Sequence, residues 1–99
     1  MLKPETFLWL HTPHDEGNYS AGWVSERNAA AAGTREGDAG RVIWHNGTNT
    51  MWYAIMYLAP EIDCAVLITA NRMSPPTRVA CDRMARTWLK QFAAARDTP

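Results

Sequence analysis

The sequence lacks a surplus of charge of either sign. Ten Lys and Arg residues balance ten Asp and Glu residues, so the formal net charge is zero. Proteins that bind nucleic acids or membrane surfaces generally depend on an electrostatic surplus. The composition therefore argues against both kinds of partner, and we expect neither nucleic acid nor membrane binding.

Long hydrophobic runs and a cysteine framework are also missing. The longest apolar run, residues 51–59, is far shorter than the roughly 20 residues that cross a bilayer. The first residues do not have the pattern of a signal peptide, so the sequence leaves the compartment open. The two cysteines, Cys64 and Cys81, lie inside apolar patterns, where we expect buried free thiols rather than a disulfide.

The chain has no credible activated nucleophile. None of its three serines precedes a lysine by three residues or lies in Gly-x-Ser-x-Gly, and a thiol in apolar surroundings is a poor nucleophile. His11, His14 and Asp15 are close along the chain, but they lie on a proline-containing loop and the third histidine is distant. The sequence therefore predicts neither a metal site nor a cofactor.

Apolar residues are plentiful, and their periodicity predicts the fold. With 99 residues, 46% of them hydrophobic, the chain fits a single domain over residues 1–99. We expect a short helix over residues 4–10, strands over 19–26, 41–46, 51–59 and 64–71, and a second helix from residue 76 or 77 onward. Residues 27–40 are expected to form a long flexible connection. The predicted class is α+β, an antiparallel meander of about four strands with an amphipathic C-terminal helix on one face and a short N-terminal helix.

The predicted strands 51–59 and 64–70 are apolar on both faces apart from Thr69. An antiparallel strand with one solvent-exposed face should instead alternate apolar and polar residues. The C-terminal helix can cover one face through residues spaced by three and four positions, namely Cys81, Met84, Ala85, Trp88, Phe92 and Ala95. The short N-terminal helix can bury little of the other face. We therefore expect the chain to lack one of the two layers that would cover the sheet.

The polar stretch around Asn46-Gly47 has two interpretations. Asn-Gly between two apolar strands is the strongest short-range signal for a hairpin turn. Against a simple turn, polar residues continue from His45 to Thr50, which is more than a chain reversal needs. The stretch is therefore either a turn or the rim of a site.

A series of segments in this order resembles a known family. The segments are YSAGW (19–23), WHNGTNT (44–50), YLAPE (57–61) and AVLITANR (65–72), followed by the last helix. They resemble the C-terminal part of the serine β-lactamase and penicillin-binding-protein-like family, and look closest to class C β-lactamases and related esterases and peptidases. The family's third motif is Lys-Thr-Gly, or His-x-Gly in esterase-like members, followed by Ser or Thr. His45-Asn46-Gly47-Thr48 matches it.

The resemblance implies roles for five residues. The Thr48 N–H would be an oxyanion-hole donor, and Gly47 would let substrate approach the backbone. His45 stands where Lys is usual, which favours an esterase- or peptidase-like parent over a penicillin hydrolase. Asn46 and Asn49 would either hydrogen-bond the substrate or stabilise the turn. The catalytic candidates are thus His45 and Thr48, and the substrate-binding candidates are Asn46, Gly47 and Asn49.

The family's other two motifs, Ser-x-x-Lys and Tyr-x-Asn, do not occur in the sequence. The resemblance therefore implies the C-terminal portion of a larger serine hydrolase that acts on a small acyl substrate and is inactive by itself. Its partner would be the missing N-terminal part of the hydrolase domain. The alternative is a stand-alone, non-catalytic binding or assembly module, which would cover its bare sheet face with a second copy of itself.

Overall fold

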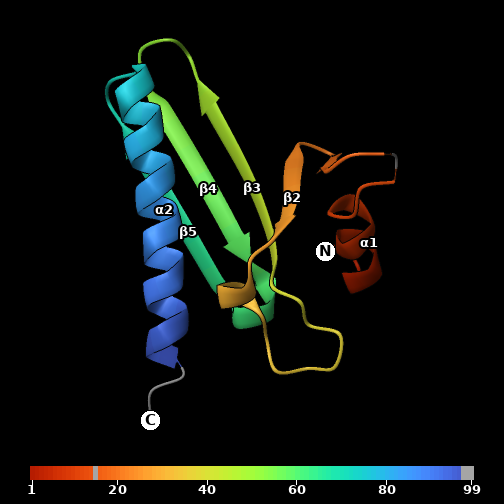
Figure 1. Cartoon of the computed structure of the whole chain (residues 1–99). Helices are drawn as coiled ribbons and strands as arrows, with labels where there is room; N and C mark the ends of the chain where they lie inside the picture. The colour runs from red at the N-terminus through yellow and green to blue at the C-terminus, as the bar shows by residue number, and fades with distance from the viewer. Residues whose placement is uncertain (15, 97–99) are drawn as a thin grey trace.

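The computed structural model describes residues 1–14 and 16–96, and a five-stranded antiparallel sheet forms its centre (Figure 1). The strands are β1 (Tyr19–Ser20), β2 (Trp23–Arg27), β3 (Arg41–Thr48), β4 (Tyr53–Ala59) and β5 (Cys64–Ala70). Each strand pairs with the next along the chain, so the predicted α+β meander is confirmed. Asp15, considered above as a metal ligand, lies outside the described residues.

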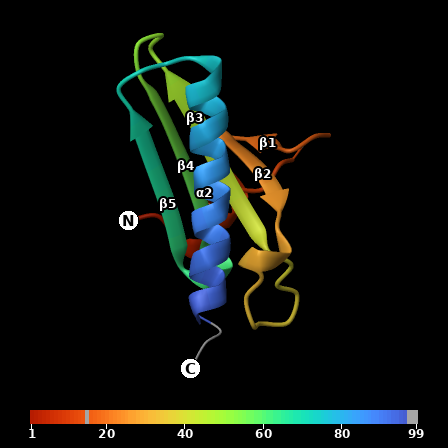
Figure 2. The ribbon, with the colours of Figure 1, turned by 60° about the vertical axis from the view of Figure 1, so that its left-hand side comes forward.

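The two helices lie on opposite sides of the sheet. The long helix α2 (Pro75–Arg96) packs over β5 and β4 (Figure 2). The short helix α1 (Pro4–Leu10) is connected to the other side, where the carbonyl oxygen of His11 accepts a hydrogen bond from Arg41 Nη2 at 2.9 Å. The ring of His11 also meets that of Trp23 edge to face. Both helices therefore form where the sequence predicted them, with α2 beginning at Pro75.

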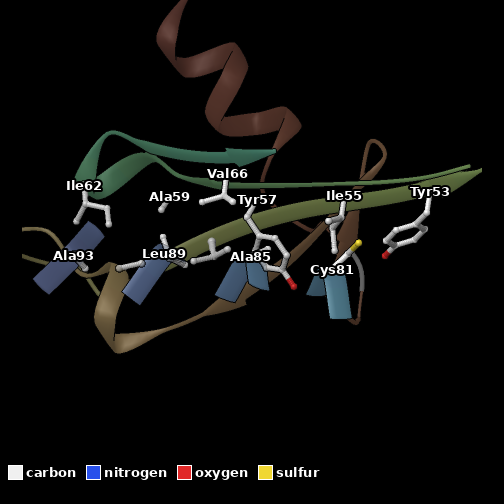
Figure 3. Close-up of a cluster of buried hydrophobic side chains, with 12 residues drawn as sticks. Tyr53, Ile55, Tyr57, Ala59, Ile62, Val66, Cys81, Ala85, Leu89 and Ala93 are labelled. Carbon is white, nitrogen blue, oxygen red and sulfur yellow. The ribbon is translucent and has the colours of Figure 1, made fainter. Parts of the chain in front are cut away.

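The hydrophobic core lies between the sheet and α2 (Figure 3). Alternate residues of β4 point into it, and α2 contributes every fourth residue. The core residues of these two elements are Tyr53, Ile55, Tyr57, Ala59, Cys81, Ala85, Leu89 and Ala93. Cys64 and Cys81 are free thiols, as expected, but only Cys81 is buried, and Cys64 is half-buried at the margin of the core.

The predicted apolar stripe of α2 is only partly correct. Cys81 and Ala85 are buried, but Met84, Trp88 and Phe92 are 43%, 48% and 41% exposed. A row of every fourth residue drifts slowly around a helix, so a helix that crosses a sheet can bury one such row and leave the next row outside.

The predicted strand over residues 19–26 is wrong as a single strand. A two-residue turn at Ala21 and Gly22 divides it into β1 and β2, with φ values of 49° and 91° at these two residues. Positive φ at both central positions is the geometry of a type I′ hairpin, which matches the twist of its flanking strands. The sheet accordingly has five strands rather than four.

Asn46-Gly47 is not a hairpin turn. Both residues lie within β3, paired with Ile55 and Ala54 of β4. The chain reverses later, where Asn49 Oδ1 accepts hydrogen bonds from the N–H groups of Met51 and Trp52 at 3.1 and 2.9 Å. The turn interpretation is therefore wrong, because the local Asn-Gly preference yields to the continuous β3–β4 ladder.

The connection between β2 and β3 is anchored to the end of the sheet. Glu61, in the short 3-10 helix η2 (Pro60–Ile62), accepts hydrogen bonds from the N–H groups of Gly33, Gly40 and Arg41 at 3.3, 2.9 and 2.8 Å. Burial alone would raise the pKa of Glu61, but these backbone donors lower it below its ordinary value. Ala31 in η1 (Ala29–Ala31) is buried as well, so the connection is more ordered than the expected flexible loop.

The sheet face opposite α2 is largely uncovered. At its centre Leu67 is 60% exposed, and Met56 and Leu58 are half-buried. Ile43, near the end where α1 is attached, is only 1% exposed. The chain therefore covers one face with α2 and only one end of the other face with α1.

Candidate functional site

The last four residues of β3 form a partly free strand edge. β2 pairs with β3 only from Arg41 to Trp44, whereas β4 pairs with β3 as far as Thr48. In the described part of the chain, residues 45–48 thus have a strand neighbour on one side only. This is the stretch that contains the matched motif.

The direction of the peptide groups along this edge follows from the hydrogen-bond pattern. The Ser25 N–H donates to the Asn18 carbonyl oxygen at 2.6 Å, so Ser25 faces β1 and Val24 faces β3. Val24 lies opposite Trp44. Successive residues of an antiparallel strand direct their N–H and C=O groups to alternate sides. The N–H groups of Asn46 and Thr48, two and four residues after Trp44, therefore point away from β4 toward the free edge.

The side chains of the motif are divided between the two faces of the sheet. Residues directly opposite in a ladder share a face, so Asn46 and Thr48 lie on the α2 side with Ile55 and Tyr53. His45 lies on the opposite, uncovered face and is exposed. The sheet therefore places the Thr48 N–H at the edge and the His45 imidazole on the open face, rather than gathering the five predicted residues in one cluster.

Two of the predicted substrate-binding side chains have partners within the chain. Asn46 Nδ2 donates to Tyr53 Oη at 3.1 Å, and Asn49 caps the β3–β4 turn. The Thr48 hydroxyl also stabilises this turn, since it donates to the Trp52 carbonyl oxygen at 2.5 Å and accepts from the Thr50 N–H at 3.0 Å. Because these three side chains are bonded within the chain, the groups available to a ligand are mainly the peptide groups of the strand edge.

Gly47 has no packing reason within the chain to be a glycine. A Cβ added there would meet no heavy atom within 4 Å, and its φ lies outside the positive range that favours glycine. By contrast, a Cβ on Gly40 would lie 1.9 Å from the Asn28 carbonyl oxygen. The open space beside Gly47 is therefore available to something outside this chain.

A groove of about 520 Å³ lies at the end of β3, on the side of β4 and β5. It is lined by uncharged residues at the ends of β3, β4 and β5 and in the loops beside them, namely Gly47, Thr48, Asn49, Trp52, Tyr53, Ala54, Thr69, Ala70 and Asn71. Trp52 and Asn71 were not among the predicted site residues. Trp52 lies just before β4, which pairs with the motif strand β3, and Asn71 lies just after β5, which pairs with β4.

A second groove, of about 480 Å³, lies on the other side of the edge, between β3 and the first turns of α2. Arg86 closes one end of it, bonded to Glu26 at 2.9 Å and to Asp82 at 3.3 Å. Asp82 also accepts a hydrogen bond from Tyr57 Oη at 2.5 Å. Burial and this hydrogen bond raise the pKa of Tyr57, so its phenol stays protonated at neutral pH. This network fixes α2 against β2 and β4, and no local sequence pattern predicted it.

The described part of the chain contains neither a metal-binding cluster nor a membrane-spanning helix. Over residues 1–14 and 16–96, no three His, Cys, Asp or Glu side chains are grouped so as to hold a metal ion. No helix in these two ranges is long and apolar enough to span a membrane.

Comparison with known proteins gives no relative from which a role could be transferred. No protein-family model, no curated protein and no solved structure matches the chain. The functional argument consequently depends on the geometry of the β3 edge and on the resemblance of its motif.

Proposed function

We propose that the chain is the C-terminal portion of a β-lactamase-like serine hydrolase, which supplies one wall of an acyl-transfer site. The observation that carries the proposal is the free edge at residues 45–48, where the Thr48 N–H points away from β4 and faces no strand among the described residues. A strand edge of this kind can receive an acyl group through its own peptide groups. The proposal assigns the nucleophile to a separate region that carries Ser-x-x-Lys.

The chemistry assigned to the edge is electrostatic. When a serine oxygen attacks an ester, amide or β-lactam carbonyl, negative charge develops on the carbonyl oxygen. A backbone N–H held in a fixed direction stabilises that charge, and losing one such donor costs about 10²–10³-fold in kcat. The pairing of Thr48 with Tyr53 in the β3–β4 ladder fixes the direction of its N–H.

The uncovered sheet face supports the same proposal. Leu67, Met56 and His45 lie on a face that α2 does not reach, and α1 covers only its other end. In the proposed hydrolase, the region with Ser-x-x-Lys and Tyr-x-Asn packs on this face. It would bring its nucleophile to the side of the sheet where His45 is exposed and Gly47 leaves the backbone open.

The substrate expected at this edge is a neutral acyl group. The groove of about 520 Å³ is lined by no charged side chain, and His45 occupies the position of the usual Lys. Histidine lacks the ammonium group with which a lysine at this position would bind a substrate carboxylate. These features favour esters over penicillin-like substrates, which carry a carboxylate.

The test is to produce the chain together with a separate polypeptide that contains the Ser-x-x-Lys and Tyr-x-Asn region of a β-lactamase-like hydrolase. We expect no p-nitrophenyl butyrate hydrolysis by the chain alone, hydrolysis by the complex, and slower turnover of nitrocefin. Thr48→Pro in the complex should lower kcat for the ester about 10²–10³-fold, because it removes the N–H that stabilises the transition state.

Thr48→Ala is the matched control. It removes the hydroxyl bonds to the turn but keeps the N–H, so it should retain most of the kcat that Thr48→Pro loses. Equal losses in the two variants would contradict the oxyanion role. A stable complex that hydrolyses neither substrate would contradict the proposed function.

A further inference from the structure

The two edges of the sheet differ greatly in length and protection. β1 is an edge strand of only two residues, whereas β5, at the other edge, has seven. The β5 sequence CAVLITA contains no charge, proline or glycine. Edge strands in monomers are usually short or protected by Lys, Pro or bulges, because an open edge pairs with other strands. Within the described residues, nothing pairs with the outer side of β5.

The peptide groups that β5 presents outward can be identified. The alternation that starts at Trp44 directs the peptide groups of His45 and its partner Met56 toward each other. Ile55 therefore faces β5, where it lies opposite Ile68. Leu67, next to Ile68, must then direct its N–H and C=O away from β4. Ala65 and Thr69 follow the same direction, so three residues offer donors and acceptors at this edge.

A row of large apolar side chains on α2 runs beside this edge. Met84, Trp88 and Phe92 are spaced by four residues and are each more than 40% exposed. Asp82 and Arg86 contact Tyr57 and Glu26, so their flank of α2 faces β2 and β3. Met84, Trp88 and Phe92 lie on the opposite flank, toward the outer side of β5. No charged residue lies on that flank between Thr77 and Ala95.

We propose that β5 and the Met84–Trp88–Phe92 row together form a two-fold interface with a second copy of this chain. In the dimer, β5 of each copy pairs antiparallel with β5 of the other, which joins the two sheets into one. A two-fold axis perpendicular to the sheet keeps both α2 helices on the same face. It also brings the Met84–Trp88–Phe92 rows of the two copies toward each other.

Strand spacing supports this arrangement quantitatively. α2 packs over β5 and β4. If its axis lies midway between them, the two α2 axes in the dimer are two strand spacings apart, or about 9.6 Å. Packed helices are separated by about 8–10 Å. The strand pairing and the helix packing can thus be satisfied by the same two-fold axis.

Charge does not oppose a second copy as the occupant. The chain has a net charge of zero, so two copies do not repel each other overall. On α2, Arg83 and Lys90 lie on the side away from the row, and so they stay outside the interface. An interface of one strand and three large side chains per copy is at the small end for specific association. We therefore expect a dimer whose population depends on protein concentration.

The experiment is sedimentation equilibrium of the full 99-residue chain over a concentration series. We expect the mass to rise with concentration from 11.1 kDa toward twice that value. Leu67→Pro should shift the chain to monomer, because it removes an outward N–H without breaking a β4–β5 bond. Trp88→Lys should do the same by placing a charge in the helix contact, which covers the case in which Leu67→Pro does not fold.

Val79→Lys is the matched control, since Val79 is an exposed apolar residue on the other flank of α2 and its variant should still dimerise. A monomeric wild type at every concentration would overturn the proposal. So would a dimer unaffected by both interface variants, or open-ended assembly beyond a dimer. These outcomes are independent of the proposed hydrolase site, because β3 and Thr48 take no part in the interface.

Discussion

Gly47 and Gly40 are the same residue type in two opposite situations. Gly40 has a φ of 82°, and a Cβ there would overlap the Asn28 backbone at 1.9 Å. Gly47 lies in a regular strand with open space where its Cβ would be. The first glycine is required by the fold of this chain, whereas the second costs backbone entropy without any internal benefit.

Alanine substitutions at the two glycines should therefore have opposite effects. Gly47→Ala is expected to raise the free energy of unfolding of the isolated chain by about 0.5–1 kcal/mol. Gly40→Ala should lower it by at least about 1–2 kcal/mol, from the left-handed conformation alone. Urea unfolding at one protein concentration, followed by circular dichroism, measures both changes. A loss of stability in Gly47→Ala would show an internal role for that glycine and weaken the case for a substrate there.

Single residues were predictable from the sequence where their type favours one environment. The cysteines were expected to be buried free thiols, and both are free, although Cys64 is only half-buried. The turn at Ala21 was not predicted, because alanine rarely adopts a positive φ and Ala21 has a φ of 49°. The turn interpretation of Asn46-Gly47 also failed, because its short-range preference is overridden by pairing with Ile55 and Ala54.

At the scale of elements, strands and helices with clear periodicity were predictable, but their contacts were not. The sequence shows two neighbouring apolar rows on α2, and only the crossing of the helix over β4 and β5 decides which row is buried. Leu89 is 1% exposed, and Met84 is 43% exposed. The Arg86 network with Glu26 and Asp82 is equally hidden from local reasoning, because 60 residues separate Arg86 from Glu26.

Which of the two apolar rows of α2 is buried can be tested by truncating one side chain in each row. Leu89→Ala should lower the free energy of unfolding by about 2–5 kcal/mol, or abolish the folding transition, because it leaves a cavity under α2. Met84→Ala should change it by less than about 1 kcal/mol, since the side chain is largely exposed. Urea unfolding midpoints at equal protein concentration give the comparison. Equal losses in both variants would mean that α2 is rotated from the orientation described above.

For the whole molecule, the main result is an imbalance between apolar surface and cover. Two strands that are apolar on both faces predicted a missing layer, and the structure places α2 on one face and leaves Leu67 open on the other. The free β3 edge, the open face and the β5 edge with its α2 row are three separate surfaces. The proposed hydrolase uses the first two, and the proposed dimer uses the third.

The uncovered face makes a prediction about the isolated chain that depends on neither association partner. The dye 8-anilinonaphthalene-1-sulfonate binds exposed apolar surface, and it should bind the folded chain at neutral pH. A molten globule also binds this dye, but it loses the near-ultraviolet circular dichroism that fixed aromatic side chains produce. Stacked Trp44 and Tyr57, with ring centroids 5.8 Å apart, should preserve that signal in the folded chain.

Trp88→Lys should leave dye binding intact, because the open face lies across the sheet from α2. Dye binding that appears only with loss of the near-ultraviolet signal would mean that the chain does not fold around α2 alone. No dye binding by a folded monomer would mean that the face opposite α2 is covered from within.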